Sequence, residues 1–111
     1  MQETVIQLVL FENRIFPNLK GYKYCFEALK IMLIKDFPLK TVYETVGKKY
    51  NIKANSIEKS VSNAISKAFL AAKMQEKYGN LCFFTGKINN KAFLNILKTQ
   101  ILSHKNNVAR I

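Results

Sequence analysis

The stretch of residues 40–69 constrains the fold most, because its apolar residues follow the spacing of two consecutive helices. In the first half, one face carries Val42, Tyr43, Val46 and Tyr50. In the second half, one stripe carries Ile57, Val61, Ala64, Ile65, Ala68 and Phe69. The spacing therefore predicts two helices within about 40–70, joined by a turn of only a few residues.

The residues between the two stripes suit a tight turn. Asn51 tolerates the left-handed conformation that ends a helix sharply. Asn55, with Glu58 three residues later, predicts a capping box for the second helix. Gly47 supplies the small residue that a close crossing needs, and Ile52 supplies an apolar plug for the turn. These features favour a helix-turn-helix, and an ordinary core hairpin with the same periodicity is the alternative.

Positive charge is concentrated on this stretch and on the C-terminal third of the chain. The 111 residues contain 18 lysines and arginines against 7 acidic residues, a formal net charge of +11. Residues 1–36 have a net charge of +1, whereas residues 37–73 and 74–111 have +5 each. Such an excess suits a polyanionic partner, with nucleic acid as the first candidate. A basic surface that only maintains solubility is the alternative.

The polar face of the second predicted helix offers groups that can contact DNA. The first turns of such a helix face base edges in the major groove. There, lysine can donate to guanine, glutamate can accept from cytosine, and asparagine can pair with adenine. The expected base-reading residues are Ser56, Glu58, Lys59 and Asn63. The expected phosphate contacts are Lys48, Lys49, Lys53 and Ser62.

Length and composition predict one domain that spans residues 1–111. An apolar content of 49% and an aromatic content of 12% argue against disorder. The apolar run at residues 5–11 is too short to span a bilayer. Cys25 and Cys82 form no metal-binding pattern, so we expect reduced thiols in a cytoplasmic protein, although a disulfide stays open.

Further elements flank the central pair. Residues 3–15 fit either a buried strand or a buried helix. Residues 22–35 predict a helix whose inner face carries Tyr22, Cys25, Phe26, Leu29, Met32 and Leu33. A last helix at about 91–103, capped by Asn90, should bury Phe93, Leu94, Ile96, Leu97 and Ile101. We expect a frayed tail from residue 104 onward.

The segment between the central pair and the last helix is less regular. Residues 70–78 continue a helical pattern, and Gly79 with Asn80 breaks it. Residues 81–84 form a short apolar run that fits a strand.

Catalysis has few candidate groups. His104 is the only histidine, the two cysteines are isolated, and the four glycines form no phosphate-binding loop. We therefore expect no enzyme activity, no metal site and no cofactor.

Several short motifs share a specific order. They are Lys20-Gly21-Tyr22-Lys23-Tyr24, Glu27-Ala28, Lys48-Lys49-Tyr50-Asn51, Glu58-Lys59 and Ala64-Ile65. Over about residues 5–104 this order resembles the C-terminal effector domain of the stage zero sporulation protein A family of response regulators. The resemblance implies an all-α fold of six helices, with residues 5–11 helical and residues 81–84 a loop or helix edge.

The resemblance also implies a function and its partners. It implies a sequence-specific transcription regulator that binds double-stranded DNA, with RNA polymerase as a candidate second partner. In the family, a Glu-Arg pair contacts bases, and the matching pair here is Glu58-Lys59. Ser56, Ser62 and Asn63 stand where the family carries arginine, arginine and histidine. Each lost arginine fork removes ~1–3 kcal/mol of base discrimination.

The resemblance also bears on self-association and on regulation by phosphorylation. Family members sit in tandem on DNA, so we expect weak or DNA-dependent self-association through the last helix, with Leu94, Ile101 and Leu102 as spare apolar groups. The family also carries an N-terminal receiver domain with a phosphorylated aspartate. Asp36 is the only aspartate here, so these residues cannot form that domain, and a fragment and a stand-alone protein both stay open. The alternative function is a protein-interaction module or antagonist that keeps the fold without reading DNA.

Overall fold

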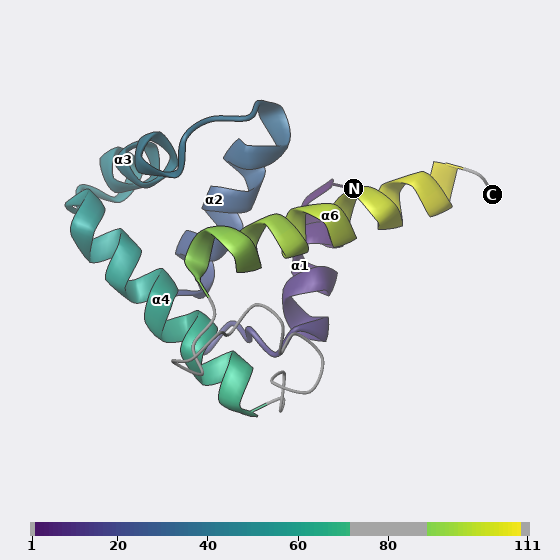
Figure 1. Ribbon diagram of the computed structural model, residues 1–111, viewed down its shortest axis with the longest axis horizontal. Helices are drawn as coiled ribbons and strands as arrows, with labels where there is room; N and C mark the ends of the chain where they lie inside the picture. Colours follow the sequence, from purple (N-terminus) through teal and green to yellow (C-terminus); the bar gives the residue numbers. More distant parts are fainter. Residues whose placement is uncertain (1, 72–88, 110–111) are drawn as a thin grey trace.

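The computed structural model describes residues 2–71 and 89–109, and within these ranges it contains five helices and no strand (Figure 1). The helices are α1 (Gln2–Glu12), α2 (Tyr22–Ile34), α3 (Leu39–Tyr50), α4 (Ala54–Ala71) and α6 (Asn90–Ala109). The all-helical class is confirmed. The expectations for residues 72–78 and 81–84 lie outside the described residues, and the predicted count of six helices is therefore untested.

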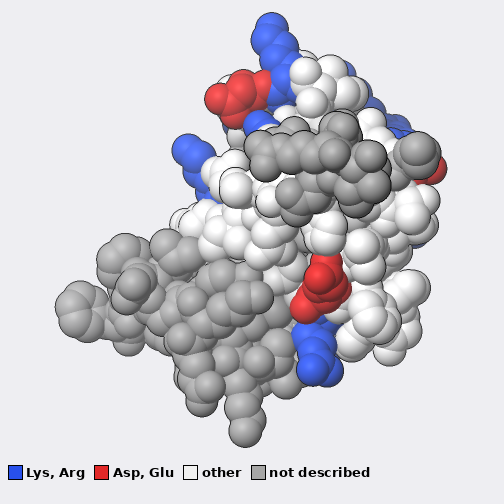
Figure 2. All heavy atoms as spheres, turned by 90° about the vertical axis from the view of Figure 1, so that its right-hand side faces the viewer, with Lys and Arg blue, Asp and Glu red and all other residues white. Residues whose placement is uncertain are grey.

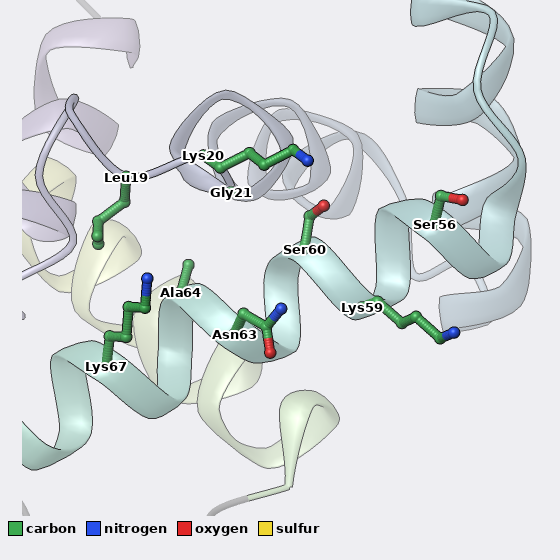
Figure 3. A pocket seen from close by; sticks show the side chains of 9 residues that line it. All are labelled: Leu19, Lys20, Gly21, Ser56, Lys59, Ser60, Asn63, Ala64 and Lys67. Carbon is green, nitrogen blue, oxygen red and sulfur yellow. The ribbon is translucent and has the colours of Figure 1, made fainter.

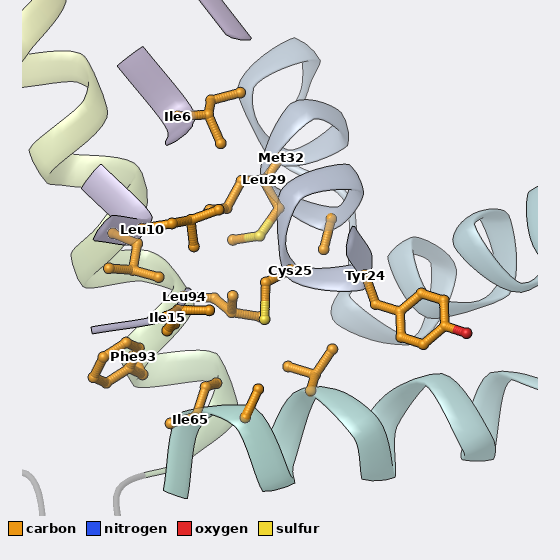
Figure 4. Close-up of a cluster of buried hydrophobic side chains, with 14 of the residues drawn as sticks. Ile6, Leu10, Ile15, Tyr24, Cys25, Leu29, Met32, Ile65, Phe93 and Leu94 are labelled. Atoms are coloured by element: carbon orange, nitrogen blue, oxygen red, sulfur yellow. The ribbon is translucent and has the colours of Figure 1, made fainter. Parts of the chain in front are cut away.

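Helix α2 occupies the centre of the fold and packs against α1, α3, α4 and α6. Side chains from all these helices meet in one core, part of which is drawn in Figure 4. Its largest fully buried members include Ile6, Leu10, Leu29, Ile65, Phe93 and Leu94. Because this core surrounds α2, the remaining helices are held in fixed positions around it.

The N-terminal stretch is a helix, as the resemblance implied, and its end is closed by a left-handed residue. Arg14 has a φ of 66°, and the N–H of Ile15 donates to the carbonyl of Leu10 at 2.9 Å. This hydrogen bond from beyond the helix end is typical of a Schellman motif. The buried Asn13 side chain donates to Val9 O at 2.8 Å and to Gln100 Oε1 at 2.7 Å, which ties α1 to α6.

The inner face of α2 differs from the predicted one. Tyr24, Glu27 and Ala28 are buried together with the predicted Cys25, Leu29 and Met32. The predicted Tyr22, Phe26 and Leu33 are only half-buried. Because α2 has neighbours on several sides, its buried arc is wider than a single apolar stripe and includes a paired carboxylate.

Helix α6 corrects two expectations. It continues to Ala109, where a frayed tail had been predicted. Its cap is Asn89, whose Oδ1 accepts from the N–H groups of Lys91 at 2.8 Å and Ala92 at 3.4 Å. The predicted cap, Asn90, lies inside the helix and its Nδ2 donates to the Tyr43 hydroxyl at 3.3 Å.

The apolar groups expected to be spare on α6 are mostly part of the core. Leu94 and Ile101 are fully buried, whereas Leu102 is 43% exposed. Of these three residues, only Leu102 is therefore available to a second molecule. Within residues 2–71 and 89–109, no helix is both long enough and apolar enough to cross a membrane.

Candidate nucleic-acid interface

The turn between α3 and α4 has the geometry that the sequence predicted. Asn51 is left-handed, with φ 55° and ψ 47°. Its N–H donates to Lys48 O at 3.4 Å, and the N–H of Ile52 donates to Gly47 O at 2.8 Å. These two bonds form a Schellman motif, which satisfies carbonyls at the end of α3. The chain is thereby turned sharply into α4, which begins at Ala54.

Gly47 permits this sharp turn because a side chain would not fit. A Cβ atom at Gly47 would lie 2.3 Å from the carbonyl oxygen of Ile52. A small residue was predicted here for a close crossing of the two helices. The structure shows that the close neighbour is the backbone of the turn itself.

The start of α4 corrects the predicted capping box. Lys53 O accepts from the N–H groups of Ser56 at 3.0 Å and Ile57 at 3.1 Å, so the first turn forms before the predicted cap. Asn55 therefore lies inside the first turn and is exposed. The predicted apolar stripe is confirmed at Ile57, Val61, Ala64, Ile65 and Ala68. The side chain of Phe69 lies outside the described part.

A second close approach places the loop before α2 against the middle of α4. A Cβ atom at Gly21 would lie 2.3 Å from Ser60 O and 2.9 Å from Ala64 Cβ. The two segments enclose a groove of about 320 Å³ (Figure 3). It is lined by Leu19, Lys20, Gly21, Ser56, Lys59, Ser60, Asn63, Ala64 and Lys67.

This groove brings together three of the four residues predicted to read bases. Ser56, Lys59 and Asn63 all line it and are all exposed. None of the nine lining residues is acidic. Among the described residues, the ammonium groups of Lys59 and Lys67 have no ion-pair partner. The groove is therefore an uncompensated positive surface with hydroxyl and amide groups between the charges.

Glu58, the fourth predicted base-reading residue, lies apart from this groove, as does Ser62. Glu58 is exposed and Ser62 is half-buried. The negative charge of Glu58 interacts electrostatically with the hydroxyl of Tyr43 on α3. Burial raises the pKa of the Tyr43 hydroxyl, the hydrogen bond from Asn90 lowers it, and the charge of Glu58 raises it further.

The predicted phosphate-binding lysines fall into two groups. Lys48 and Lys53 line a second groove, of about 570 Å³, beside Asn51 at the turn. Lys49 instead forms an ion pair within the protein, with its Nζ 2.5 Å from Glu27 Oε2. Sequence periodicity provided no signal for this pair, because the two residues are on different helices.

On the opposite side of the molecule, the residues that the structure describes show no such gathering of basic side chains. Figure 2 views the fold from the right-hand side of Figure 1, which lies away from α3 and α4. On that face, the described basic side chains are scattered, and acidic ones lie beside several of them. Among the described residues, no group of three or more histidine, cysteine or acidic side chains is placed to hold a metal ion.

The fold and the groove define a small helical domain in which a groove along α4 is lined by three lysines and no acidic residue, a surface that suits a polyanion such as nucleic acid. Residues 6–101 match the family described as the sporulation initiation factor Spo0A C terminal. The chain therefore belongs to this family, which comprises DNA-binding effector domains of sporulation response regulators. No solved structure matches the chain.

Proposed function

We propose that this chain regulates transcription by binding a specific sequence of duplex DNA, with α3 and α4 acting as a helix-turn-helix. The observation that carries the proposal is the exposed face of α4, where Ser56, Lys59 and Asn63 line an acid-free groove. In this arrangement α4 enters the major groove, and α3 crosses the DNA backbone.

Each exposed group on α4 has a definite chemistry toward bases. Lys59 donates to guanine O6 or N7, and the amide of Asn63 both donates to and accepts from adenine. Ser56 offers a short hydroxyl that bonds to several bases and discriminates little. We assign Lys59 and Asn63 the main reading roles, and give Glu58 a secondary role because it lies toward Tyr43.

The phosphate contacts are proposed at the turn. Lys48 and Lys53 flank the Schellman turn, where the backbone of duplex DNA passes when α4 lies in the groove. Lys49 contacts a phosphate only if its ion pair with Glu27 is broken or shared with the DNA. Ser62 lies on α4 outside the groove. We therefore give both residues a secondary role in phosphate contact.

A protein-interaction module is the second candidate function. It is favoured by Ser56 and Ser62, which stand where the family carries arginine and which lack the two-pronged grip on guanine. The same departures are consistent with a DNA-binding protein that reads a different or less stringent sequence. The retained basic groove favours DNA binding.

Selection from a library of random duplexes separates these functions. A DNA-reading protein enriches a short sequence over successive rounds, and methylation of guanine N7 in that sequence interferes with binding. Binding without enrichment of any sequence would contradict base reading. Failure to bind duplex at low salt would contradict the DNA role and favour the interaction module.

Two further partners are proposed on narrower grounds. Weak or DNA-dependent self-association through α6 rests on the exposed Leu102, since Leu94 and Ile101 are buried. Contact with RNA polymerase rests on family membership alone. Sedimentation with and without DNA tests the first, and a tight dimer without DNA would contradict it.

A further inference from the structure

We infer that Lys20 and Lys67 form a phosphate clamp along the α4 groove, with Lys20 directed toward Ser60 and Lys67 beyond Ala64 (Figure 3). This clamp holds the DNA backbone while Lys59 faces the bases. Lys20 belongs to the loop before α2, outside the α3–α4 pair. The inference rests on the proposed DNA binding and adds a contact site to it. Its ligand is the phosphodiester group of a duplex strand.

Position along α4 separates the roles of its two lysines. Lys67 follows Lys59 by eight residues, which corresponds to about 12 Å along the helix at about 1.5 Å per residue. Base edges are contacted by the first turns of a recognition helix. Figure 3 shows Lys59 extending away from Lys67, and Lys67 extending toward the loop that carries Leu19. Lys67 therefore meets the backbone that rises beside the groove.

The loop before α2 is fixed in a position to complete the clamp. Gly21 brings it so close to α4 that a Cβ atom would be only 2.3 Å from Ser60 O. Lys20 is the neighbour of Gly21 and is exposed on the same groove. The contact at Gly21 thus holds an ammonium group from a second segment beside the face of α4.

The electrostatics of the groove favour an anion. Three lysines line it with no acidic residue among the nine lining residues. Within residues 2–71 and 89–109, Lys20 and Lys67 have no ion-pair partner, whereas Lys30 and Lys49 are both paired with Glu27. Lysine binds phosphate as a point charge without needing a particular base. A phosphodiester would relieve the mutual repulsion of the three ammonium groups.

The test is the salt dependence of duplex binding in variants that lose one charge each. Lys20→Gln and Lys67→Gln are compared with wild type on a random-sequence duplex between low and physiological salt. Each phosphate contact contributes about 0.9 to the slope of log affinity against log salt. We expect each variant to lose about 0.9 of slope and the double variant to lose about twice that. Base preference in duplex selection should stay unchanged.

Lys35→Gln is the matched control. Lys35 is exposed at the opposite end of α2 from Lys20, about 20 Å away along a helix of 13 residues. The Lys35→Gln variant removes the same formal charge, so it shows how much of a change in the salt slope comes from net charge alone. Its slope should equal that of wild type, and thermal unfolding monitored by circular dichroism checks that all variants are folded.

The possible outcomes separate this inference from the proposed function. A steep wild-type slope that Lys20→Gln and Lys67→Gln leave unchanged, or change no more than Lys35→Gln does, overturns the clamp alone. A flat wild-type slope overturns both the clamp and DNA binding. Repeating the titration in phosphate and in chloride at equal ionic strength distinguishes the source of the phosphate. Inhibition by free phosphate that disappears in the double variant, while the slope in chloride stays at the wild-type value, would assign the groove to a free anion and overturn the clamp.

Discussion

The ammonium group of Lys49 on α3 lies 2.5 Å from one carboxylate oxygen of Glu27 on α2, and the other carboxylate oxygen lies 3.5 Å from Lys30. Glu27 is only 7% exposed. A carboxylate at such a depth is costly unless it is paired. The pair with Lys49 therefore connects α2 to α3, whereas the pair with Lys30 lies within α2.

Removing the charge of Glu27 should destabilise the fold. We expect Glu27→Gln to lower the free energy of unfolding by about 1–2 kcal/mol, because hydrogen bonds to a charged group are lost in a part-buried site. Urea denaturation at neutral pH measures the change. Glu44→Gln is the control, since Glu44 is exposed on α3, and it should change stability by less than about 0.5 kcal/mol. Equal losses in the two variants would contradict a structural role for the Glu27 ion pairs.

The contact between Gly21 and α4 should be sensitive to a single methyl group. In Gly21→Ala the added Cβ would meet Ser60 O at 2.3 Å and Ala64 Cβ at 2.9 Å, so the loop must move away from α4. We expect a loss of about 1–3 kcal/mol, which is typical of overpacking. Lys20→Ala, next to it but exposed, should stay within about 0.5 kcal/mol. Wild-type stability for Gly21→Ala would show that the loop is not tightly held.

Cys25 should be unreactive until the protein unfolds. Burial raises the pKa of its thiol from the usual 9.0 to about 12. In a Cys82→Ser background, iodoacetamide at pH 8 should modify Cys25 rapidly in denaturant and very slowly in buffer, because the thiolate is the nucleophile. Equal labelling rates in the two conditions would contradict the buried position.

The same thiol predicts a dependence of stability on alkaline pH. Below about pH 9 the thiol is protonated in both states and has no effect. As the pH rises from 9 toward 12, the unfolded thiol ionises while the folded one stays protonated, so the free energy of unfolding falls. Cys25→Ala in the Cys82→Ser background should lose this part of the fall. Parallel pH profiles of the two proteins would contradict the raised pKa.

The features that the sequence predicted correctly are local ones. The stripe from Ile57 to Ala68 follows from helical spacing, and the left-handed Asn51 follows from the preferences of asparagine. Ser56, Lys59 and Asn63 meet in one groove because one helix face orders them. Periodicity and residue preferences within one segment contain all the information that these predictions require.

The features that the sequence did not predict depend on distant segments. Gly21 lies against Ser60, and Glu27 pairs with Lys49, through packing that no local pattern encodes. The position of Lys20 at the groove was not predicted for the same reason. The cap of α6 was misplaced by one residue because two asparagines adjoin. The structure shows Asn89 Oδ1 accepting from the first N–H groups of the helix, while the Asn90 side chain contacts Tyr43 instead.

The central claim is that α4 reads bases through Lys59. The most direct test measures the binding of Lys59→Ala and Lys53→Ala to a selected duplex and to a scrambled one. We predict that Lys59→Ala loses about 1–3 kcal/mol on the selected duplex and much less on the scrambled one, because a contact specific to one base is removed. Lys53→Ala, at the turn, should weaken binding to both duplexes alike. Equal losses on both duplexes for Lys59→Ala would reduce Lys59 to a phosphate contact and contradict base reading by this helix.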